Sequence, residues 1–158
     1  ARSLEVTMTW IASLVTVLGL VAIAAALGLV FRARTGRVHT VQAGASIPVI
    51  RPADVASEAA FGHRATLLQF STEFCAPCRG TRVLLGELAA DRDGVVHVDV
   101  DLTDRPELAR RFSVSQTPTI LLLDGSGAVR ARIAGAPRRD ELRTRLDETL
   151  RSHHARIA

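Results

Sequence analysis

Two cysteines, Cys75 and Cys78, have the residue type and spacing best suited to chemistry. They are the only cysteines among 158 residues, and Ala76 and Pro77 separate them. An apolar run that includes Phe70 precedes them and a segment with helical periodicity follows, which places Cys75 at a helix N-terminus. Unpaired backbone N–H groups and the positive end of the helix dipole favour a thiolate at that position. A thiolate with a second sulfur one turn away could break and form disulfides.

A metal site is the alternative interpretation of a C-x-x-C pair. Structural zinc takes four ligands. No second pair of ligands completes such a site, because the five histidines are dispersed along the chain. The histidines are His39, His63, His97, His153 and His154. Two cysteines this close in sequence also close too short a loop to stabilise a fold. Redox chemistry is what remains, and we expect neither a metal nor a cofactor.

The composition indicates an apolar block joined to an ordinary domain, and it disfavours nucleic-acid binding. Mean hydropathy is positive (+0.20) although 23% of the residues are charged. Basic residues exceed acidic ones by four, and all of them are arginines scattered along the chain. A nucleic-acid surface would need clustered arginines with aromatic residues between them, but aromatics make up only 4%.

The apolar block lies at residues 10–31, which contain no charged side chain. As a helix this segment would span roughly 33 Å, enough for the hydrocarbon core of a bilayer. Trp10 would mark one membrane interface, and Arg32, Arg34 and Arg37 the other. No face of this helix is polar, unlike a core helix, and the run is too long for a cleavable signal. We therefore predict a single-pass anchor after a short tail at residues 1–9.

The arginines also predict the orientation of this anchor in the cell membrane. Three follow the span, whereas only Arg2 and the α-amino group precede it. The positive-inside rule then places the C-terminal domain in the cytoplasm. Anchored thiol proteins commonly act outside the cytoplasm, which keeps the opposite orientation open. Met8 could be a natural start of the chain.

The rest of the chain predicts an α/β domain at residues 47–152, after a linker at 32–46 and before a tail at 153–158. Strands are expected at 47–50, 65–71, 95–100, 119–123 and 128–133, and helices at 52–61, 77–90, 106–112 and from Pro137 onward. The helix after the cysteines should bury Val83, Leu84, Leu85 and Leu88, and the last helix Leu142, Leu146 and Leu150. This order, β-α-β-α-β-β-α, predicts a central mixed sheet with helices on both faces.

The element order, the C-x-x-C between a strand and a helix, and Thr117-Pro118-Thr119 before an apolar strand together resemble thioredoxin. The resemblance covers essentially the whole domain and implies a thioredoxin fold in which Pro118 is the family's cis-proline. It implies that Cys75 attacks a substrate disulfide and that Cys78 resolves the mixed disulfide. The substrate-binding residues would be Phe74, Ala76, Pro77, Thr117 and Pro118.

Several residues depart from the thioredoxin pattern. Gln69 stands where the family usually has a buried Asp, and an amide cannot act as a general base, so deprotonation of Cys78 would need water or another carboxylate. Phe74 replaces the usual Trp, Ala76 the usual Gly, and Val83 a Pro that bends the helix. These departures predict a slower or more specialised reductase with a straighter helix.

Charged residues around the motif have ordinary interpretations. Asp99 and Asp101 could form an acidic pair, but solvated charges at a strand end are the simpler explanation. Arg79 and Arg82 could add positive potential beside Cys75, although exposed arginines usually belong to a helix surface. His97 is expected to lie on a face of the sheet, and Glu73 is expected to be a solvated surface residue.

We therefore expect a membrane-anchored thiol–disulfide oxidoreductase that reduces protein disulfides. Its partners would be protein disulfides and an electron-donating reductase or a low-molecular-weight thiol system, with the membrane bound through residues 10–31. Two alternatives stay open: an extracytoplasmic disulfide exchanger, and a binding module with this fold that holds thiol-containing partners with little turnover.

Overall fold

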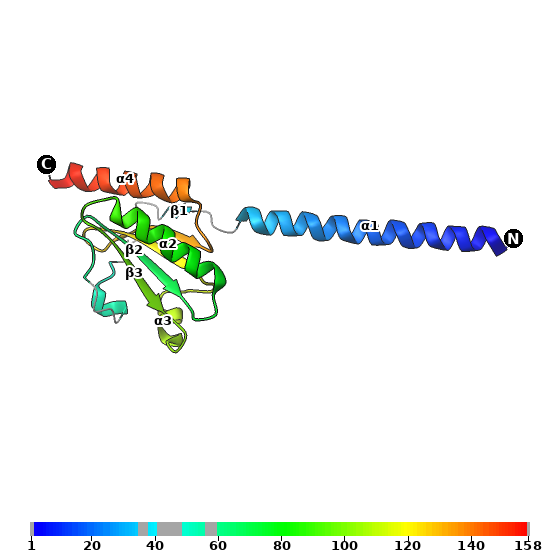
Figure 1. Cartoon of the computed structure of the whole chain (residues 1–158), viewed down its shortest axis with the longest axis horizontal. Coiled ribbons are helices and arrows are strands. Elements are labelled where there is room, and N and C mark those ends of the chain that lie inside the picture. Colours follow the sequence, from blue (N-terminus) through cyan, green and yellow to red (C-terminus); the bar gives the residue numbers. More distant parts are fainter. Residues whose placement is uncertain (1, 35–37, 41–48, 56–59, 158) are drawn as a thin grey trace. The chain divides into compact units, whose positions relative to one another are not determined.

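The computed structural model describes residues 2–34, 38–40, 49–55 and 60–157. Its contacts divide the chain into two compact units, Ala1–Thr35 and Gly36–Ala158. Figure 1 shows the order of the elements in each unit.

The first unit is one long helix, α1 (Arg2–Arg34). Its segment Ser13–Val30 is long and apolar enough to cross a membrane, judged by length and composition, and none of this segment is buried. The segment lies inside the predicted span at 10–31, and the helix also includes residues 2–9, which were predicted as a tail. The prediction of an apolar N-terminal helix is therefore confirmed.

The second unit is built on a five-stranded mixed sheet with the strand order β1-β5-β4-β2-β3. Strands β2 and β3 are parallel, and the other neighbours are antiparallel. The bounds are β1 Val38–Thr40, β2 Ala65–Ser71, β3 Val95–Asp101, β4 Thr119–Asp124 and β5 Val129–Ala134. Buried apolar runs make the central strands β2 and β4, as expected for strands covered on both faces. The predicted mixed sheet is confirmed.

Helices cover both faces of the sheet, as the sequence predicted. Helix α2 (Ala76–Ala90) and helix α4 (Arg139–Ile157) pack on one face, whereas α3 (Pro106–Arg111) and the 3-10 turn η1 (Pro52–Val55) lie on the other. The α4 stripe of leucines is buried against the sheet, and it consists of Leu142, Leu146 and Leu150. Full burial of one such side chain is worth about 1.5–3 kcal/mol. Cys75 follows β2 as the N-cap residue of α2, and Cys78 lies in the first turn of α2.

The apolar face predicted for α2 was wrong at one position. The buried positions are Cys78, Thr81, Leu85 and Leu88, which repeat every three or four residues. Val83 is out of phase with this repeat, and 62% of its surface is exposed. Leu84 is half-buried and packs against the core.

The segments before β2 also differ from the prediction. Residues 38–40 were assigned to a linker, but they form the edge strand β1, which pairs with β5. For the strand expected at 47–50, residues 47 and 48 lie outside the described residues, Val49 forms an isolated bridge to Ala128, and the Ile50 amide donates to Gly127. Of the helix expected at 52–61, residues 52–55 form the single turn η1, residues 60 and 61 are not helical, and residues 56–59 lie outside the described residues.

Candidate active site

The cysteines lie where β2 leads into α2. Cys75 is the N-cap residue of α2 and has an extended backbone, and Pro77 occupies the first turn, where its missing N–H costs no hydrogen bond. The Cys75 amide donates to the Thr72 carbonyl over 3.2 Å, and the Cys78 amide donates to the Cys75 carbonyl over 3.1 Å. This turn brings the two sulfurs together, and they form a disulfide. The predicted placement at a helix N-terminus is confirmed.

One side of this disulfide faces solvent. Phe74 has 89% of its surface exposed, and Ala76 and Pro77 are also exposed. Cys75 is half-buried. We call residues 74–77 the exposed rim. Cys75 is thus the less buried of the two cysteines, and thiol–disulfide exchange requires an accessible sulfur.

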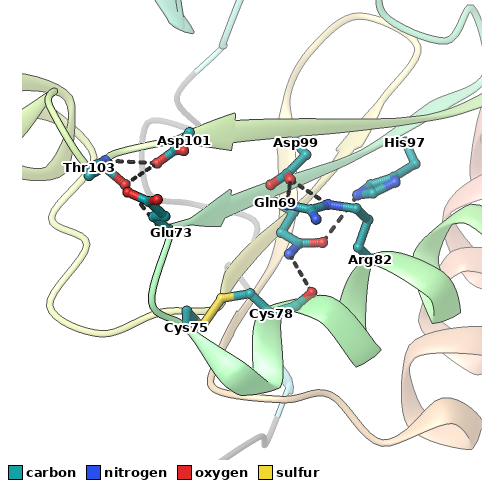
Figure 2. A network of polar contacts seen from close by, with 9 residues as sticks. All are labelled: Gln69, Glu73, Cys75, Cys78, Arg82, His97, Asp99, Asp101 and Thr103. Atoms are coloured by element: carbon teal, nitrogen blue, oxygen red, sulfur yellow. Dashed lines mark hydrogen bonds and ion pairs between the residues drawn. A yellow bond between two sulfur atoms is a disulfide. The ribbon is translucent and has the colours of Figure 1, made fainter.

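The other sulfur is buried above a group of polar side chains. Cys78 has only 2% of its surface exposed, and Gln69 beneath it is fully buried. Gln69 Nε2 donates to the Cys78 carbonyl over 3.1 Å, and Gln69 Oε1 lies 3.2 Å from His97 Nε2 (Figure 2). Asp99 lies beside Gln69 in the parallel register of β2 and β3. We call Gln69, Cys78, His97 and Asp99 the polar floor.

An ion pair connects the polar floor to the surface of α2. Arg82 Nε donates to Asp99 Oδ2 over 2.7 Å, and Arg82 NH2 contacts the same oxygen (Figure 2). The other carboxylate oxygen of Asp99 is buried and has no hydrogen-bond partner. The expectation that Arg82 is only helix surface was therefore incomplete, because the sequence could not show which strand lies under this arginine.

Burial lowers the pKa of His97 below its ordinary value. The Asp99 carboxylate acts in the opposite direction, and the Arg82 guanidinium adds to the lowering. His97 is a half-buried residue on the sheet face under α2, as the sequence predicted. Its hydrogen bond to Gln69 was not predicted.

The acidic pair that Asp99 and Asp101 could have formed is not observed, because each carboxylate has its own partner. Asp101 Oδ1 accepts from the Thr103 amide over 2.8 Å and from the Thr103 hydroxyl over 2.6 Å. These bonds lower the pKa of Asp101. Thr103 Oγ1 also accepts from the Glu73 amide over 2.9 Å (Figure 2). Asp101 thus orders the loop that holds the chain just before the cysteines, and Glu73 itself is exposed as expected.

The residues predicted to complete the substrate site also lie close to this turn. The Thr117–Pro118 peptide bond is cis, as the resemblance implied. The hydroxyl oxygens of Thr117 and Thr72 are 3.3 Å apart, which connects the Pro118 loop to the segment before Cys75. The Pro118 carbonyl accepts from Gly135, whose φ of +89° favours glycine. Among the described residues, no group of His, Cys, Asp and Glu could hold a metal ion.

Comparisons with known proteins agree with this geometry. The family model described as Thioredoxin matches residues 49–148. Thioredoxin H5 from Oryza sativa subsp. japonica is 31% identical over 46% of this chain and 53% of its own length. Thioredoxin from Mycolicibacterium smegmatis is 33% identical over 53% of this chain and 77% of its own length. The match to the rice protein thus spans only about half of that relative.

A solved structure supports the fold independently. A mutant thioredoxin from Halobacterium salinarum NRC-1 superposes with a TM-score of 0.50 at 20% identity, covering 56% of this chain and 76% of that chain. At this identity the likeness bears on the fold alone. Because the family model matches more than half of the residues and the cysteine pair lies at the N-terminus of α2, which follows β2, the chain belongs to the thioredoxin family.

Proposed function

We propose that this protein is a membrane-anchored thiol–disulfide oxidoreductase that reduces protein disulfides. The observation that carries the proposal is the asymmetry of the disulfide at the N-terminus of α2. Cys75 is accessible at the exposed rim, whereas Cys78 is buried one turn into the helix. Family membership supports the reaction class.

The reaction follows from these positions. In the reduced protein the Cys75 thiolate, stabilised by the N-terminal end of α2, attacks one sulfur of a substrate disulfide and releases the other as a thiolate. The Cys78 thiolate then attacks Cys75 Sγ in the mixed disulfide and releases the second substrate sulfur. The substrate gains two electrons and two protons, and the protein is left with the Cys75–Cys78 disulfide. An external reductase or low-molecular-weight thiol must then reduce this disulfide.

Substrate would bind across the exposed rim and along the loop before Pro118. Phe74, Ala76 and Pro77 offer an apolar contact surface around Cys75. Thr117, before the cis-proline, would offer its backbone to an extended substrate peptide, in the manner of an added strand. Backbone pairing of this kind depends little on substrate side chains and suits a reductase of varied protein disulfides.

An insulin-reduction assay tests the activity. The full chain in detergent micelles is mixed with insulin and dithiothreitol, and precipitation of the released insulin chains is followed. We expect wild type to accelerate precipitation and Cys75→Ser to match the rate without protein. Equal rates for the two proteins would overturn the enzymatic proposal and favour a binding module.

We further propose that α1 anchors the domain in the cell membrane with the domain in the cytoplasm. The length and composition of Ser13–Val30 support the anchor, and the arginines that follow it support the orientation. A membrane-impermeant thiol reagent tests both, since a cytoplasmic Cys75 should be labelled only after the cells are permeabilised. Labelling in intact cells would place the domain outside, and recovery in the soluble fraction would contradict the anchor. A variant with Ser at both cysteine positions controls for nonspecific labelling.

A further inference from the structure

A continuous chain of hydrogen bonds connects the resolving cysteine to an imidazole. Gln69 Nε2 donates to the Cys78 carbonyl, so its oxygen end faces His97. An amide oxygen can only accept, and therefore the proton on the His97 ring lies on Nε2 and the free acceptor is Nδ1. Figure 2 shows Gln69 between the ring and the first turn of α2. His97 is thus fixed relative to Cys78 and retains one nitrogen that can take a proton.

The charged groups that act on His97 are Asp99 on its own strand and Arg82 on α2. These two form an ion pair with each other, and their charges act on the ring in opposite directions, with the effect of Asp99 the larger. Strand β2 contributes the neutral Gln69 and, directly beside His97 in the register, the apolar Leu67. The ring is neutral at neutral pH, because burial lowers its pKa, and it becomes positive as the pH falls.

We propose that His97 is a positioning residue for the resolving thiol: through Gln69 it fixes the Cys78 backbone, and its positive charge at acidic pH keeps more Cys78 as thiolate. The proposal rests on the proposed function, because a resolving thiolate matters only for a protein that exchanges disulfides. It differs from an acid–base role, since His97 acts through Gln69 and does not touch the sulfur.

The step that His97 influences is the second half of the reaction. Cys78 loses its proton to water, and its thiolate attacks Cys75 Sγ. The Cys75–Cys78 bond forms while the bond between Cys75 and the substrate sulfur breaks, and the leaving sulfur takes a proton from water. His97 gains a proton at Nδ1 from solvent and is not consumed. A positively charged His97 ring stabilises the thiolate form of Cys78, and it strengthens the hydrogen bond from the ring to Gln69 Oε1.

The proposal predicts a particular shape for the thiolate titration. Without a coupled group, the thiolate fraction falls tenfold for each pH unit below the thiol pKa. With His97, the fall becomes shallower where the ring gains its proton. Below that point, wild-type His97 should give roughly three- to tenfold more thiolate than a neutral substitute. Above the pH at which the ring gains its proton, wild-type His97 and the neutral substitute should give the same thiolate fraction.

Alkylation of Cys78 measures this directly. In the full-length Cys75→Ser protein Cys78 is the only thiol, and its reaction with iodoacetamide in micelles is followed by mass spectrometry from about pH 5 to pH 9. We expect a bend in the profile that disappears in Cys75→Ser/His97→Gln. The matched control is Cys75→Ser/His63→Gln, because His63 is an exposed histidine outside the site, and it should retain the bend.

Ring NMR signals of His97 supply a second readout that does not depend on the substitution. The ring pKa in Cys75→Ser should coincide with the pH of the bend. A straight profile in Cys75→Ser, a bend retained after His97→Gln, or a ring pKa away from the bend would each overturn the proposal. These measurements need no substrate, so a failed insulin assay would remove the proposed function without changing them. Insulin reduction by the wild type, together with a straight alkylation profile in Cys75→Ser, would overturn only the role of His97.

Discussion

The two sulfurs of the Cys75–Cys78 disulfide have different surroundings. The exposed rim is one continuous stretch, residues 74–77, and its side chains are exposed except that of Cys75, which is half-buried. The polar floor brings together β2, α2 and β3, through hydrogen bonds between residues 9 and 28 positions apart. A change in the rim should therefore act on encounters with substrate. A change in the floor should act on stability and on the state of Cys78.

The largest expected difference is between the reactivities of the two cysteines. In single-cysteine proteins, Cys75 in Cys78→Ser should react with iodoacetamide on the order of a hundredfold faster than Cys78 in Cys75→Ser. Cys75 is more accessible and lies at the N-terminus of α2, which favours its thiolate. Rates at one neutral pH, measured by mass spectrometry, check this. Equal rates would remove the distinction between rim and floor.

Substitution of one residue from each region should separate stability from substrate binding. Gln69→Ala should lower the free energy of unfolding by about 2 kcal/mol, because it leaves a cavity and removes the bonds to Cys78 and His97. Phe74→Ala should change it by less than about 0.5 kcal/mol and should raise the KM for insulin, since the ring is exposed.

Urea unfolding, monitored by circular dichroism, gives the free energy of unfolding of each variant. Tryptophan fluorescence is unsuitable, because the single tryptophan, Trp10, lies in α1 and the chain has no tyrosine. A Phe74→Ala protein as destabilised as Gln69→Ala would contradict the comparison.

The ion pair at the edge of the polar floor should contribute less. Arg82→Ala should cost about 1 kcal/mol, because it leaves the half-buried Asp99 carboxylate without its cation. Arg79→Ala is the matched control on the same helix, and it should cost less than about 0.5 kcal/mol, since Arg79 is exposed. A double-mutant cycle of Arg82→Ala with Asp99→Asn isolates the pair. A coupling of zero would show that the contact does not stabilise the floor.

The smallest effect is expected from the loop held by Asp101. Hydrogen bonds from Thr103 lower the pKa of Asp101 in the folded protein, so they stabilise it when the carboxylate is ionised. This contribution is complete above the ordinary carboxyl pKa and is lost as the pH falls through the lowered value. Thr103→Ala should raise the pKa of Asp101 toward its ordinary value, which carboxyl NMR titration measures. An unchanged pKa would show that Thr103 does not hold the carboxylate.

The sequence predicted the exposed rim better than the polar floor, for physical reasons. The rim is a local motif, and a strand followed by a helix is enough to place Cys75. The floor depends on the parallel register that sets Gln69 beside Asp99, and local patterns do not contain that register. The Gln69–His97 bond and the Arg82–Asp99 pair were therefore missed.

The difference between local patterns and tertiary contacts also explains which parts of the fold were predicted correctly. Buried apolar runs identified β2 and β4, and the leucine stripe identified the face of α4. Val83 was misplaced because a cluster of apolar residues does not reveal which phase of the helix faces the core. Strand β1 was missed because three residues have no pattern of their own, and their pairing with β5 is a tertiary contact.

Covalent trapping of a substrate tests the central claim most directly. Reduced full-length Cys78→Ser and Cys75→Ser proteins in micelles are each incubated with insulin, and the adducts are mapped by mass spectrometry. We predict that Cys78→Ser accumulates a disulfide between Cys75 and an insulin cysteine, because nothing resolves it, and that Cys75→Ser accumulates almost none. An adduct that forms as readily on Cys78, or no adduct on Cys75, would contradict the assignment of Cys75 as nucleophile and Cys78 as resolving thiol.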